Sequence, residues 1–345
     1  GVGKTTTKEM IAAVLRTALR TQWTEKNYNN ESGLPVSVLR LKPDCEAAVL
    51  EMGMNHFGEL SVLTRIAQPD LAVITNIGTM HIENLGSREG ILRAKLEILE
   101  GLRPGGRVIF NGDDALLRPL AARYHAVCFG LSEGCDVRAS RVCESAEGSK
   151  FTVHAFGKSF EAALSVPGLH NVLDALAAAA VGLLLGLSPE QIAEGLQSYA
   201  PLRQRVSHAA GMTIIDDCYN AGPESMRAAL RVLAGTPTEG RRIAVLGGML
   251  ELGDFAPELH AGVGREAAKT ADLLLAYGPC SECYVQGAHE AGLAGARAFA
   301  THDALVAALE ETCRAGDTLL FKGSHGMHME QVLARLLKTK EHMGE

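Results

Sequence analysis

The first residues of the chain, GVGKTTTKEM, have the composition of a phosphate-binding loop that runs into a helix. Gly1 and Gly3 would let backbone N–H groups turn toward a phosphate, and the ammonium of Lys4 would meet the β and γ oxygens. Thr5 and Thr6 follow, and a threonine hydroxyl at this place can ligate Mg²⁺. The full pattern has an earlier glycine and a preceding strand, so we interpret the chain as lacking the start of this loop. The stretch predicts nucleotide binding. The alternative is a chance G-x-G-K-T at a helix start.

Polar side chains also follow several apolar runs that have the character of strands. Glu51 ends the run AAVLE, Asn76 follows LAVIT, and His81 lies five residues beyond Asn76. Because the carboxyl ends of parallel strands share one edge of a sheet, these residues and Lys4 are expected to meet there. A carboxylate and an imidazole near a triphosphate are suitable Mg²⁺ ligands.

Each of these residues has a plainer alternative. Glu51 could be a solvated charge at a strand end, and His81 a helix cap or a core histidine. The stretch NGDD at residues 111–114 is interpreted as a turn from its composition. Lys95, in RAKLE, would on its own be a surface lysine.

The elements that must position these residues alternate along the first part of the chain. Buried parallel strands are typically short and apolar on both faces. Such strands are predicted at Val36–Leu41, Ala47–Glu51, Leu71–Thr75, Val108–Asn111 and Ala126–Phe129. Helical spacing predicts helices at Thr6–Leu19, Glu59–Ala67, Arg88–Gly101 and Ala115–Tyr124. The polar, Asn-rich segment Gln22–Gly33 is predicted as a loop. This alternation predicts an α/β fold with a doubly wound parallel sheet.

The pattern then changes twice. Alternating polar and apolar residues predict antiparallel hairpins over Asp136–Val142, Phe151–Phe156 and Phe160–Leu164. An Ala-rich helix, Asn171–Leu185, follows, and Ser188-Pro189-Glu190-Gln191 has the residues of a capping box at the start of another helix. Beyond Ala200-Pro201 the alternation restarts as a second, smaller α/β domain. Its predicted elements are Met212–Ile215, Glu224–Leu233, Ile243–Leu246, Glu258–Thr270, Leu273–Ala276, Asp303–Cys313 and Thr318–Lys322.

Composition narrows the function classes. A net charge of −7 argues against a general nucleic-acid or anionic-membrane binder, and an aromatic content of 5% argues against a base-stacking surface. The scattered cysteines suit reduced cytosolic thiols, and the CxxC at Cys280 and Cys283 is interpreted as structural. The longest apolar run, Ala175–Leu187, is too short to span a bilayer.

The order of motifs resembles the Mur ligases, the ATP-dependent amide-forming ligases of peptidoglycan precursor synthesis. The resemblance runs through GKTTTKEM, EMGMNHFGEL, TNIGTMHIENLGSREGI, RAKLEIL, PGLHNVLDALAAAA, IIDDCYNAGPESMRAAL, LGGMLELG and LFKGSHGMHME. The family has a UDP-substrate domain, a central ATPase and a C-terminal Rossmann-like domain. The resemblance implies that residues 1–200 are the central P-loop ATPase domain without its start, and that residues 201–345 are the C-terminal domain.

The resemblance also implies roles at the phosphate and metal site. Lys4 and Thr5 would hold the phosphates of ATP and a first Mg²⁺. Glu51 and His81 match magnesium-binding positions of the family, and Asn76 lies in the same strand-end motif. Lys95 matches a lysine that carries a carbamate in many members. That carbamate would serve a second Mg²⁺.

Further roles fall on later motifs. His170-Asn171 matches the HN dipeptide near the adenine. Arg203 or Arg205 would supply a cation to the γ-phosphate, with spacing that favours Arg203. The motif DDxYNA, here Asp217, Tyr219 and Asn220, would lie near the nucleotide, and Lys322-Gly323-Ser324 matches the KGS motif. Asp174, Gly222, Gly248 and His325 depart from the family pattern, and the last three leave the details of acceptor binding open.

The implied reaction joins D-Ala-D-Ala to UDP-MurNAc-tripeptide through an acyl phosphate, with ATP and Mg²⁺, in the cytoplasm. We expect a monomer that binds neither nucleic acid nor membranes. Two enzymatic alternatives are another Mur ligase with a different amino acid and a folylpolyglutamate synthetase. An alternative of another class is a nucleotide-binding module without activity.

Overall fold

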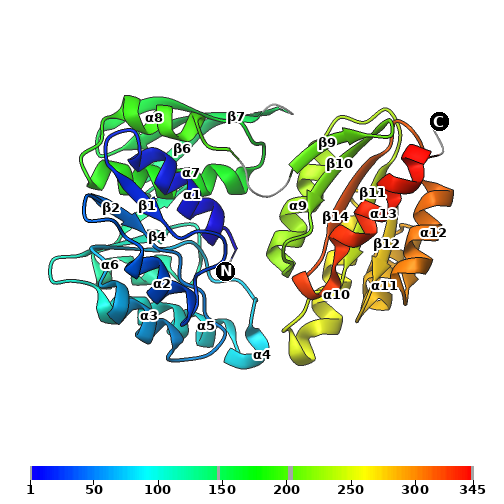
Figure 1. Cartoon of the computed structure of the whole chain (residues 1–345), viewed down its shortest axis with the longest axis horizontal. Helices are drawn as coiled ribbons and strands as arrows, with labels where there is room; N and C mark the ends of the chain where they lie inside the picture. The colour runs from blue at the N-terminus through cyan, green and yellow to red at the C-terminus, as the bar shows by residue number, and fades with distance from the viewer. Residues whose placement is uncertain (1, 146–147, 201–204, 343–345) are drawn as a thin grey trace. The chain divides into compact units, whose positions relative to one another are not determined.

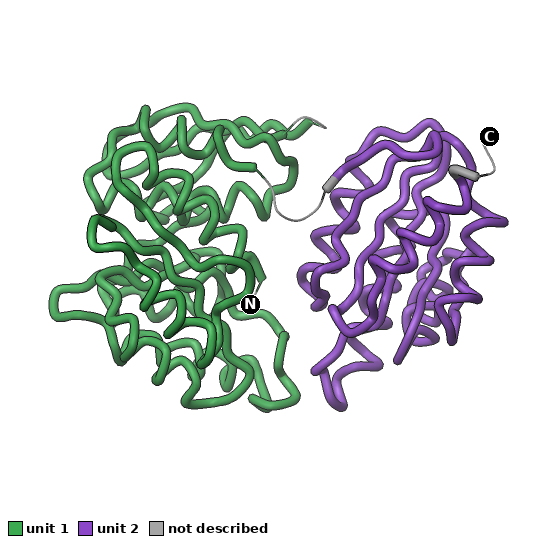
Figure 2. Tube along the Cα trace, in the orientation of Figure 1, with its two compact units in different colours: residues 1–200 green, residues 201–345 purple. Residues whose placement is uncertain are grey.

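In the computed structural model, residues 2–145, 148–200 and 205–342 are described, apart from the side chains of Arg205, Glu341 and His342. Contacts within the chain divide it into two compact units, residues 1–200 and 201–345 (Figure 2). Each unit has its own sheet and its own buried core. No helix among the described residues is both long and apolar enough to cross a membrane.

The first unit is built on a six-stranded sheet of order β3-β4-β5-β6-β7-β8. The strands β3 to β6 run parallel, and β6, β7 and β8 pair antiparallel, as the alternating pattern predicted. A separate pair, β1 and β2, is parallel. The strands of this unit are β1 (Thr21–Trp23), β2 (Ala47–Val49), β3 (Leu71–Ile74), β4 (Arg107–Asn111), β5 (Val127–Gly130), β6 (Val137–Ser145), β7 (Gly148–Ala155) and β8 (Lys158–Leu164).

Helices cover this sheet, and three of them, α1, α7 and α8, pack together (Figure 1). The capping box predicted at Ser188 is confirmed, since its hydroxyl accepts from the N–H of Gln191 and the Gln191 side chain accepts in return. The helices of this unit are α1 (Lys4–Leu15), α2 (Gly33–Leu39), α3 (Glu59–Ala67), α4 (Ile82–Leu85), α5 (Arg88–Leu96), α6 (Ala121–Tyr124), α7 (Leu169–Leu184) and α8 (Pro189–Gln197), with the 3₁₀ turns η1 (Glu97–Gly101) and η2 (Arg118–Leu120).

Two predictions near the Asn-rich segment are wrong. The predicted strand Val36–Leu41 is the helix α2, which begins where the side chain of Asn30 accepts a hydrogen bond from the N–H of Gly33. The apolar run suggested a strand buried on both faces, but Leu39 within it is 84% exposed and lies on the outer face of a helix. The strand β1 falls partly inside the predicted loop, since three residues are too few to show an alternating pattern.

The second unit has a six-stranded sheet of order β13-β12-β11-β14-β10-β9, parallel except for β9. Its strands are β9 (Arg205–Ala209), β10 (Met212–Asp217), β11 (Arg242–Gly247), β12 (Leu273–Tyr277), β13 (Ala296–Phe299) and β14 (Thr318–Lys322). Its helices are α9 (Pro223–Gly235), α10 (Ala256–Ala267), α11 (Ser281–Glu290), α12 (His302–Thr312) and α13 (Met329–His342), with the 3₁₀ turns η3 (Gly253–Phe255) and η4 (His325–Met327). Four of these elements, β9, α11, β13 and α13, were not predicted from the sequence.

Alternate residues of the central strands face opposite helical layers. Ile243 and Phe321 belong to a cluster with residues of α12 and α13. Ala244 and Leu320, one residue along, are also fully buried but lie outside that cluster. Since side chains alternate across a strand, these residues face the layer in which α10 packs against α9 and α11. Burial on both faces explains why the strands are apolar throughout.

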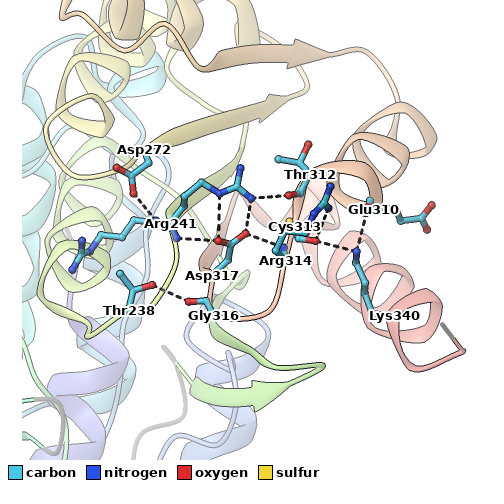
Figure 3. Close-up of polar contacts among 11 residues, drawn as sticks. Thr238, Arg241, Asp272, Glu310, Thr312, Cys313, Arg314, Gly316, Asp317 and Lys340 are labelled. Atoms are coloured by element: carbon cyan, nitrogen blue, oxygen red, sulfur yellow. Dashed lines mark hydrogen bonds and ion pairs between the residues drawn. The ribbon is translucent and has the colours of Figure 1, made fainter. Parts of the chain in front are cut away.

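Asp317 joins the amino ends of β11 and β14 (Figure 3). Its carboxylate accepts hydrogen bonds from the backbone N–H and the guanidinium of Arg241, the shortest at 2.8 Å, and from the N–H of Arg314 at 2.9 Å. Nearby, Lys340 donates to the carbonyls of Glu310 and Cys313. The network therefore fastens α12, α13 and two central strands at the edge opposite to the strand carboxyl ends.

Candidate functional site

The phosphate-loop motif is fastened to α7. Gly3 has a φ of 85°, and a Cβ there would lie 2.6 Å from an oxygen of Asp174. The hydroxyl of Thr7 donates a 2.7 Å hydrogen bond to the same carboxyl. Glycine is required at this position for two reasons, the left-handed backbone and the close approach of Asp174. The predicted residues Lys4, Thr5 and Thr6 form the first turn of α1, directly after this contact.

Asn76 holds the backbone of Val2 at the carboxyl end of β3. The N–H of Val2 donates to Oδ1 of Asn76 at 3.0 Å, and Nδ2 of Asn76 donates to the carbonyl of Val2 at 2.9 Å. The hydroxyl of Thr75 donates to the same carbonyl at 3.0 Å. The side chain of Asn76, a predicted site residue, therefore contacts the loop that carries the phosphate motif. Gly1 lies outside the described residues.

The loop after Asn76 is fixed by residues from two other segments. Asp114 accepts a 2.7 Å hydrogen bond from the N–H of Ile77, and the guanidinium of Arg88 donates to the carbonyl of Ile77 at 2.8 Å. His81 precedes α4 with a φ of 64°, a conformation that is uncommon for residues other than glycine. Nine other non-glycine residues in the described part of the chain also have a positive φ, so this conformation does not by itself single out His81.

The turn at residues 111–114 is confirmed. Oδ1 of Asn111 accepts from the N–H of Asp113, and Oδ1 of Asp114 accepts from the N–H of Leu116 and of Leu117. Composition predicted this turn but not the second contact of Asp114, to the loop that carries His81. The contact between Asp114 and Ile77 joins residues far apart in the sequence, so no local sequence pattern predicts it.

A cavity of about 600 Å³ brings three predicted residues together. Lys4 from α1, Glu51 after β2 and Lys95 from α5 all line it, together with residues along β2 and β3. His81 is not among the lining residues. Lys4 and Glu51 therefore line one cavity, with Lys95 added by a helix. The prediction that the strand ends share one edge of one sheet is wrong for Glu51, because β2 pairs with β1 in a separate sheet and Asn76 follows β3 in the six-stranded sheet.

Lys95 is 8% exposed, and its pKa is lowered to about 8. Burial is the main cause, because it disfavours the charged ammonium, and the positive charge of Lys4 acts in the same direction. The negative charge of Asp114 opposes both effects. An amine with this pKa is largely neutral at slightly alkaline pH and can act as a nucleophile.

Glu51 is buried at 6% exposure, with its two oxygens in different surroundings. Oε1 accepts a 2.8 Å hydrogen bond from the side chain of Asn29, while Oε2 is buried and has no protein partner among the described residues. Such an oxygen fits a cation, since a buried carboxylate needs a partner for its charge. In the described part of the chain, no three His, Cys, Asp or Glu side chains gather into a metal site. Mg²⁺ does not need such a set, because water and phosphate supply most of its ligands.

The predicted adenine contacts lie at the start of α7. Nδ2 of Asn171 donates a 2.6 Å hydrogen bond to the carbonyl of Pro167, which fixes the entry of the chain into the helix. His170 lies next to Gly168, where an added Cβ would be 2.5 Å from the imidazole ring.

In the second unit, the predicted residues lie at the carboxyl ends of β10 and β14. Asp217 and Lys322 are paired in the strand register, and Nζ of Lys322 donates to Asp217 at 2.6 Å and to the carbonyl of Asn220 at 2.9 Å. Tyr219 is 43% exposed, and its ring lies 6.3 Å from that of His325. Arg203 lies outside the described residues, and the side chain of Arg205 is likewise not described.

Both units match domains of one protein family. Residues 1–182 match the Mur ligase middle domain, and residues 203–325 match the Mur ligase, glutamate ligase domain. A UDP-N-acetylmuramoyl-tripeptide–D-alanyl-D-alanine ligase from Bacillus subtilis is 39% identical over 342 residues, which cover 98% of this chain and 74% of the relative. A ligase of the same name from Escherichia coli is 34% identical over 345 residues, 97% of this chain and 75% of the relative.

Solved structures agree with these relatives. MurF from Acinetobacter baumannii superposes with a TM-score of 0.90 at 35% identity, covering 97% of this chain and 74% of that one. MurF from Thermotoga maritima in complex with ADP has a TM-score of 0.88 at 29% identity, covering 99% of this chain and 79% of that one. A folylpolyglutamate synthase from Mycobacterium tuberculosis, at 16% identity and a TM-score of 0.70, shares the fold alone.

Proposed function

The chain belongs to the Mur ligase family, and we propose that it uses ATP to join D-Ala-D-Ala to UDP-MurNAc-tripeptide in peptidoglycan synthesis. The observation that carries this proposal is the cavity on which Lys4, Glu51 and Lys95 converge, in a chain 39% identical to a ligase of that name. Phosphoryl transfer needs groups that hold the phosphates and Mg²⁺. Lys4 after a glycine loop suits the phosphates, and Oε2 of Glu51, which has no partner among the described residues, suits the ion.

ATP is the nucleotide of this proposal. A MurF neighbour has been solved with ADP, which supports ATP as the phosphoryl donor. The helix α1 begins at Lys4, so the N–H groups of its first turn and the Lys4 ammonium would bind the phosphates. Asn76 would hold the loop in place for them through Val2. His170 and Asn171 would lie near the adenine.

Mg²⁺ would be held by Thr5, Glu51 and His81, with Lys95 at a second ion. When bound, the ions neutralise charge on the phosphates as it develops. Oε2 of Glu51 supports this assignment, because it is buried and has no hydrogen-bond partner among the described residues. The assignment of His81 rests on its match to a magnesium-binding position of the family, since His81 does not line the cavity.

Lys95 would contribute as a carbamate. The neutral amine attacks the carbon of CO₂, a C–N bond forms, and the nitrogen loses a proton, so that a cation becomes an anionic oxygen ligand. A pKa of about 8 supports this role, because the reaction needs the neutral amine.

The reaction would proceed in two steps. A carboxylate oxygen of the tripeptide attacks the γ-phosphorus of ATP, the bond to the β-phosphate oxygen breaks, and ADP and an acyl phosphate form. The amine of D-Ala-D-Ala then attacks the acyl carbon, releases a proton and expels phosphate. Lys4 would stabilise charge in the first step, and Arg203 of the second unit would add a cation for the γ-phosphate. Asp217, Tyr219 and Asn220, which match the DDxYNA motif, would lie near the nucleotide.

The test is phosphate release from ATP with UDP-MurNAc-tripeptide and D-Ala-D-Ala. Release should require both substrates, and mass spectrometry should find the pentapeptide product. Release that instead required glutamate or another single amino acid would reject this acceptor. Nucleotide binding without release would favour the alternative class, a nucleotide-binding module without activity. We further propose that the protein is a monomer and that it acts in the cytoplasm. Analytical ultracentrifugation of the purified chain tests whether it is a monomer.

A further inference from the structure

The Asn-rich segment before α2 contacts Glu51, the proposed metal ligand. Its composition had predicted only a loop. Nδ2 of Asn29 donates a 2.8 Å hydrogen bond to Oε1 of Glu51. We propose that Asn29 is a positioning residue that holds Glu51 so that Oε2 stays available for the cation. This inference rests on the proposed function, in which Glu51 binds Mg²⁺.

The backbones on both sides of this hydrogen bond are fixed. The N–H of Glu51 donates to the hydroxyl of Thr24 at 3.0 Å, and the carbonyl of Thr24 accepts a 2.6 Å hydrogen bond from Lys8. Thr24 is fully buried and Lys8 is 3% exposed, so this chain of contacts lies inside the unit. Glu51 therefore follows β2 in a position that α1 and the end of β1 determine.

Asn29 is held from the other side by Gly53. The N–H of Gly53 donates to the carbonyl of Asn29 at 2.7 Å. An added Cβ on Gly53 would lie 3.3 Å from three atoms of the Asn29 side chain, so the backbone of Gly53 lies close beside the amide. Only Oε1 is occupied by this contact, and Oε2 is left buried and unpartnered among the described residues.

The chemistry of an amide suits this role. Its N–H stabilises an ionised carboxylate without adding positive charge that would repel a cation. An Arg or Lys in the same place would pair with the carboxylate and compete with the metal. Hydrogen-bond partners of metal ligands typically change metal affinity by about 10- to 100-fold when they are removed.

The test compares Asn29→Ala with Asn30→Ala. Both changes remove one amide from the same loop, and each removes one described side-chain hydrogen bond. Asn30, however, accepts from the N–H of Gly33 at the start of α2 and has no described contact with Glu51. Mn²⁺ affinity is measured in the presence of ADP from the electron paramagnetic resonance signal of free Mn²⁺.

We expect Asn29→Ala to weaken Mn²⁺ binding about tenfold or more, and Asn30→Ala to leave it within about twofold of the wild type. Saturating Mg²⁺ should restore kcat in Asn29→Ala while the Mg²⁺ concentration for half activation rises. Equal weakening in both variants would overturn the inference, because a general loosening of the loop would explain it. Unchanged Mn²⁺ affinity in Asn29→Ala would overturn it as well.

Two further variants separate this inference from the proposed function. Glu51→Gln should lose Mn²⁺ binding, and Asn29→Ala added to it should cause no further loss. If Glu51→Gln binds Mn²⁺ like the wild type, the proposed metal role of Glu51 is wrong. If Glu51→Gln loses binding and Asn29→Ala keeps it, only the positioning role is wrong. Asn29→Ser, whose hydroxyl is too short to reach Oε1, repeats the test should the alanine variant fold poorly.

Discussion

Thr7 and Asp174 join the first helix of the chain to α7 through a 2.7 Å hydrogen bond between the hydroxyl and the carboxyl. Asp174 is 7% exposed, and its pKa is raised to about 8. Burial is the main cause, and the hydrogen bond from Thr7 acts in the opposite direction. A protonated carboxyl therefore lies against Gly3, in a loop that we propose to bind phosphate.

The replacement Asp174→Asn should change how stability depends on pH. The unfolded chain releases this proton near pH 3.8 and the folded chain near 8, so the folded state binds more protons between these values. The wild-type contribution is present below pH 3.8 and is lost as pH rises toward 8. Asn keeps the acceptor for Thr7 and cannot ionise. Relative to the wild type, the free energy of unfolding of Asp174→Asn should rise by about 2 to 4 kcal/mol from pH 5 to pH 8.

Urea unfolding at both pH values measures this change. The control is Asp44→Asn, whose side chain is 67% exposed and should show no such trend. A constant difference between Asp174→Asn and the wild type would contradict a buried, neutral carboxyl.

Lys95 should react with CO₂ at a rate that follows the neutral amine. With a pKa of about 8, its initial rate at fixed dissolved CO₂ should reach half its maximum near pH 8, whereas an ordinary lysine would need a pH near 10.5. Carbon-13 NMR with labelled CO₂ would show the carbamate carbon. Lys95→Arg should abolish the signal, and Lys269→Arg, at a lysine whose side chain is 66% exposed, should retain it. A signal that survives in Lys95→Arg would place the carbamate elsewhere.

Asn76→Ala should weaken nucleotide binding. The change removes two of the three described hydrogen bonds that hold the backbone of Val2, and the loss of about 1.4 kcal/mol corresponds to a tenfold weaker affinity. Isothermal titration with ADP and Mg²⁺ measures it. Asn84→Ala, at an exposed position in α4, is the matched control. An ADP affinity equal in both variants would show that the loop keeps its conformation without the Asn76 amide.

Asp317→Asn should make the second unit less stable, most clearly at neutral pH. Burial alone would raise the pKa of Asp317, but hydrogen bonds from Arg241 and from the N–H of Arg314 outweigh it and lower the pKa. The contribution of the carboxylate is therefore present above its unfolded pKa and is lost as pH falls through the folded value. We expect a loss of about 1 to 3 kcal/mol at pH 7 that shrinks in acid.

Thermal unfolding followed by circular dichroism at pH 7 and pH 3 would check this prediction. Asp303→Asn is the control, since its carboxylate is 84% exposed and pairs only with the surface residue Arg335 among the described ion pairs. If Asp317→Asn had the same melting temperature as the wild type at pH 7, the network in Figure 3 would not contribute measurably to stability.

The sequence anticipated those parts of the fold whose signals are local. The helix Glu59–Ala67 and the strand Thr318–Lys322 have the predicted bounds, because periodicity and flanking residues agree there. Val36–Leu41 was misassigned because an apolar run does not reveal that a helix begins at Gly33, whose N–H donates to the side chain of Asn30. Lys4 and Glu51 line one cavity as expected, but the single sheet edge predicted to hold them is wrong, because β2 and β3 belong to different sheets.

The partners of these residues could not be predicted in the same way. Asn29 with Glu51 and Asp114 with Ile77 are contacts across long stretches of sequence, and each depends on how a loop is packed. Their residue types suggest only turns. Arg203, which spacing favoured as the cation of the second unit, lies outside the described residues and stays a prediction.

The pair of Lys322 and Asp217 has a consequence for any anion that reaches this edge of the second unit. Lys322 is 2% exposed, and its ammonium already donates to Asp217 and to the carbonyl of Asn220. The charges of Lys322 and Asp217 are 2.6 Å apart, so their fields largely cancel at longer range and Lys322 attracts a distant anion only weakly. An incoming carboxylate or phosphate would then need neutral donors or a cation from outside the edge, and Tyr219, which is 43% exposed, lies at this edge.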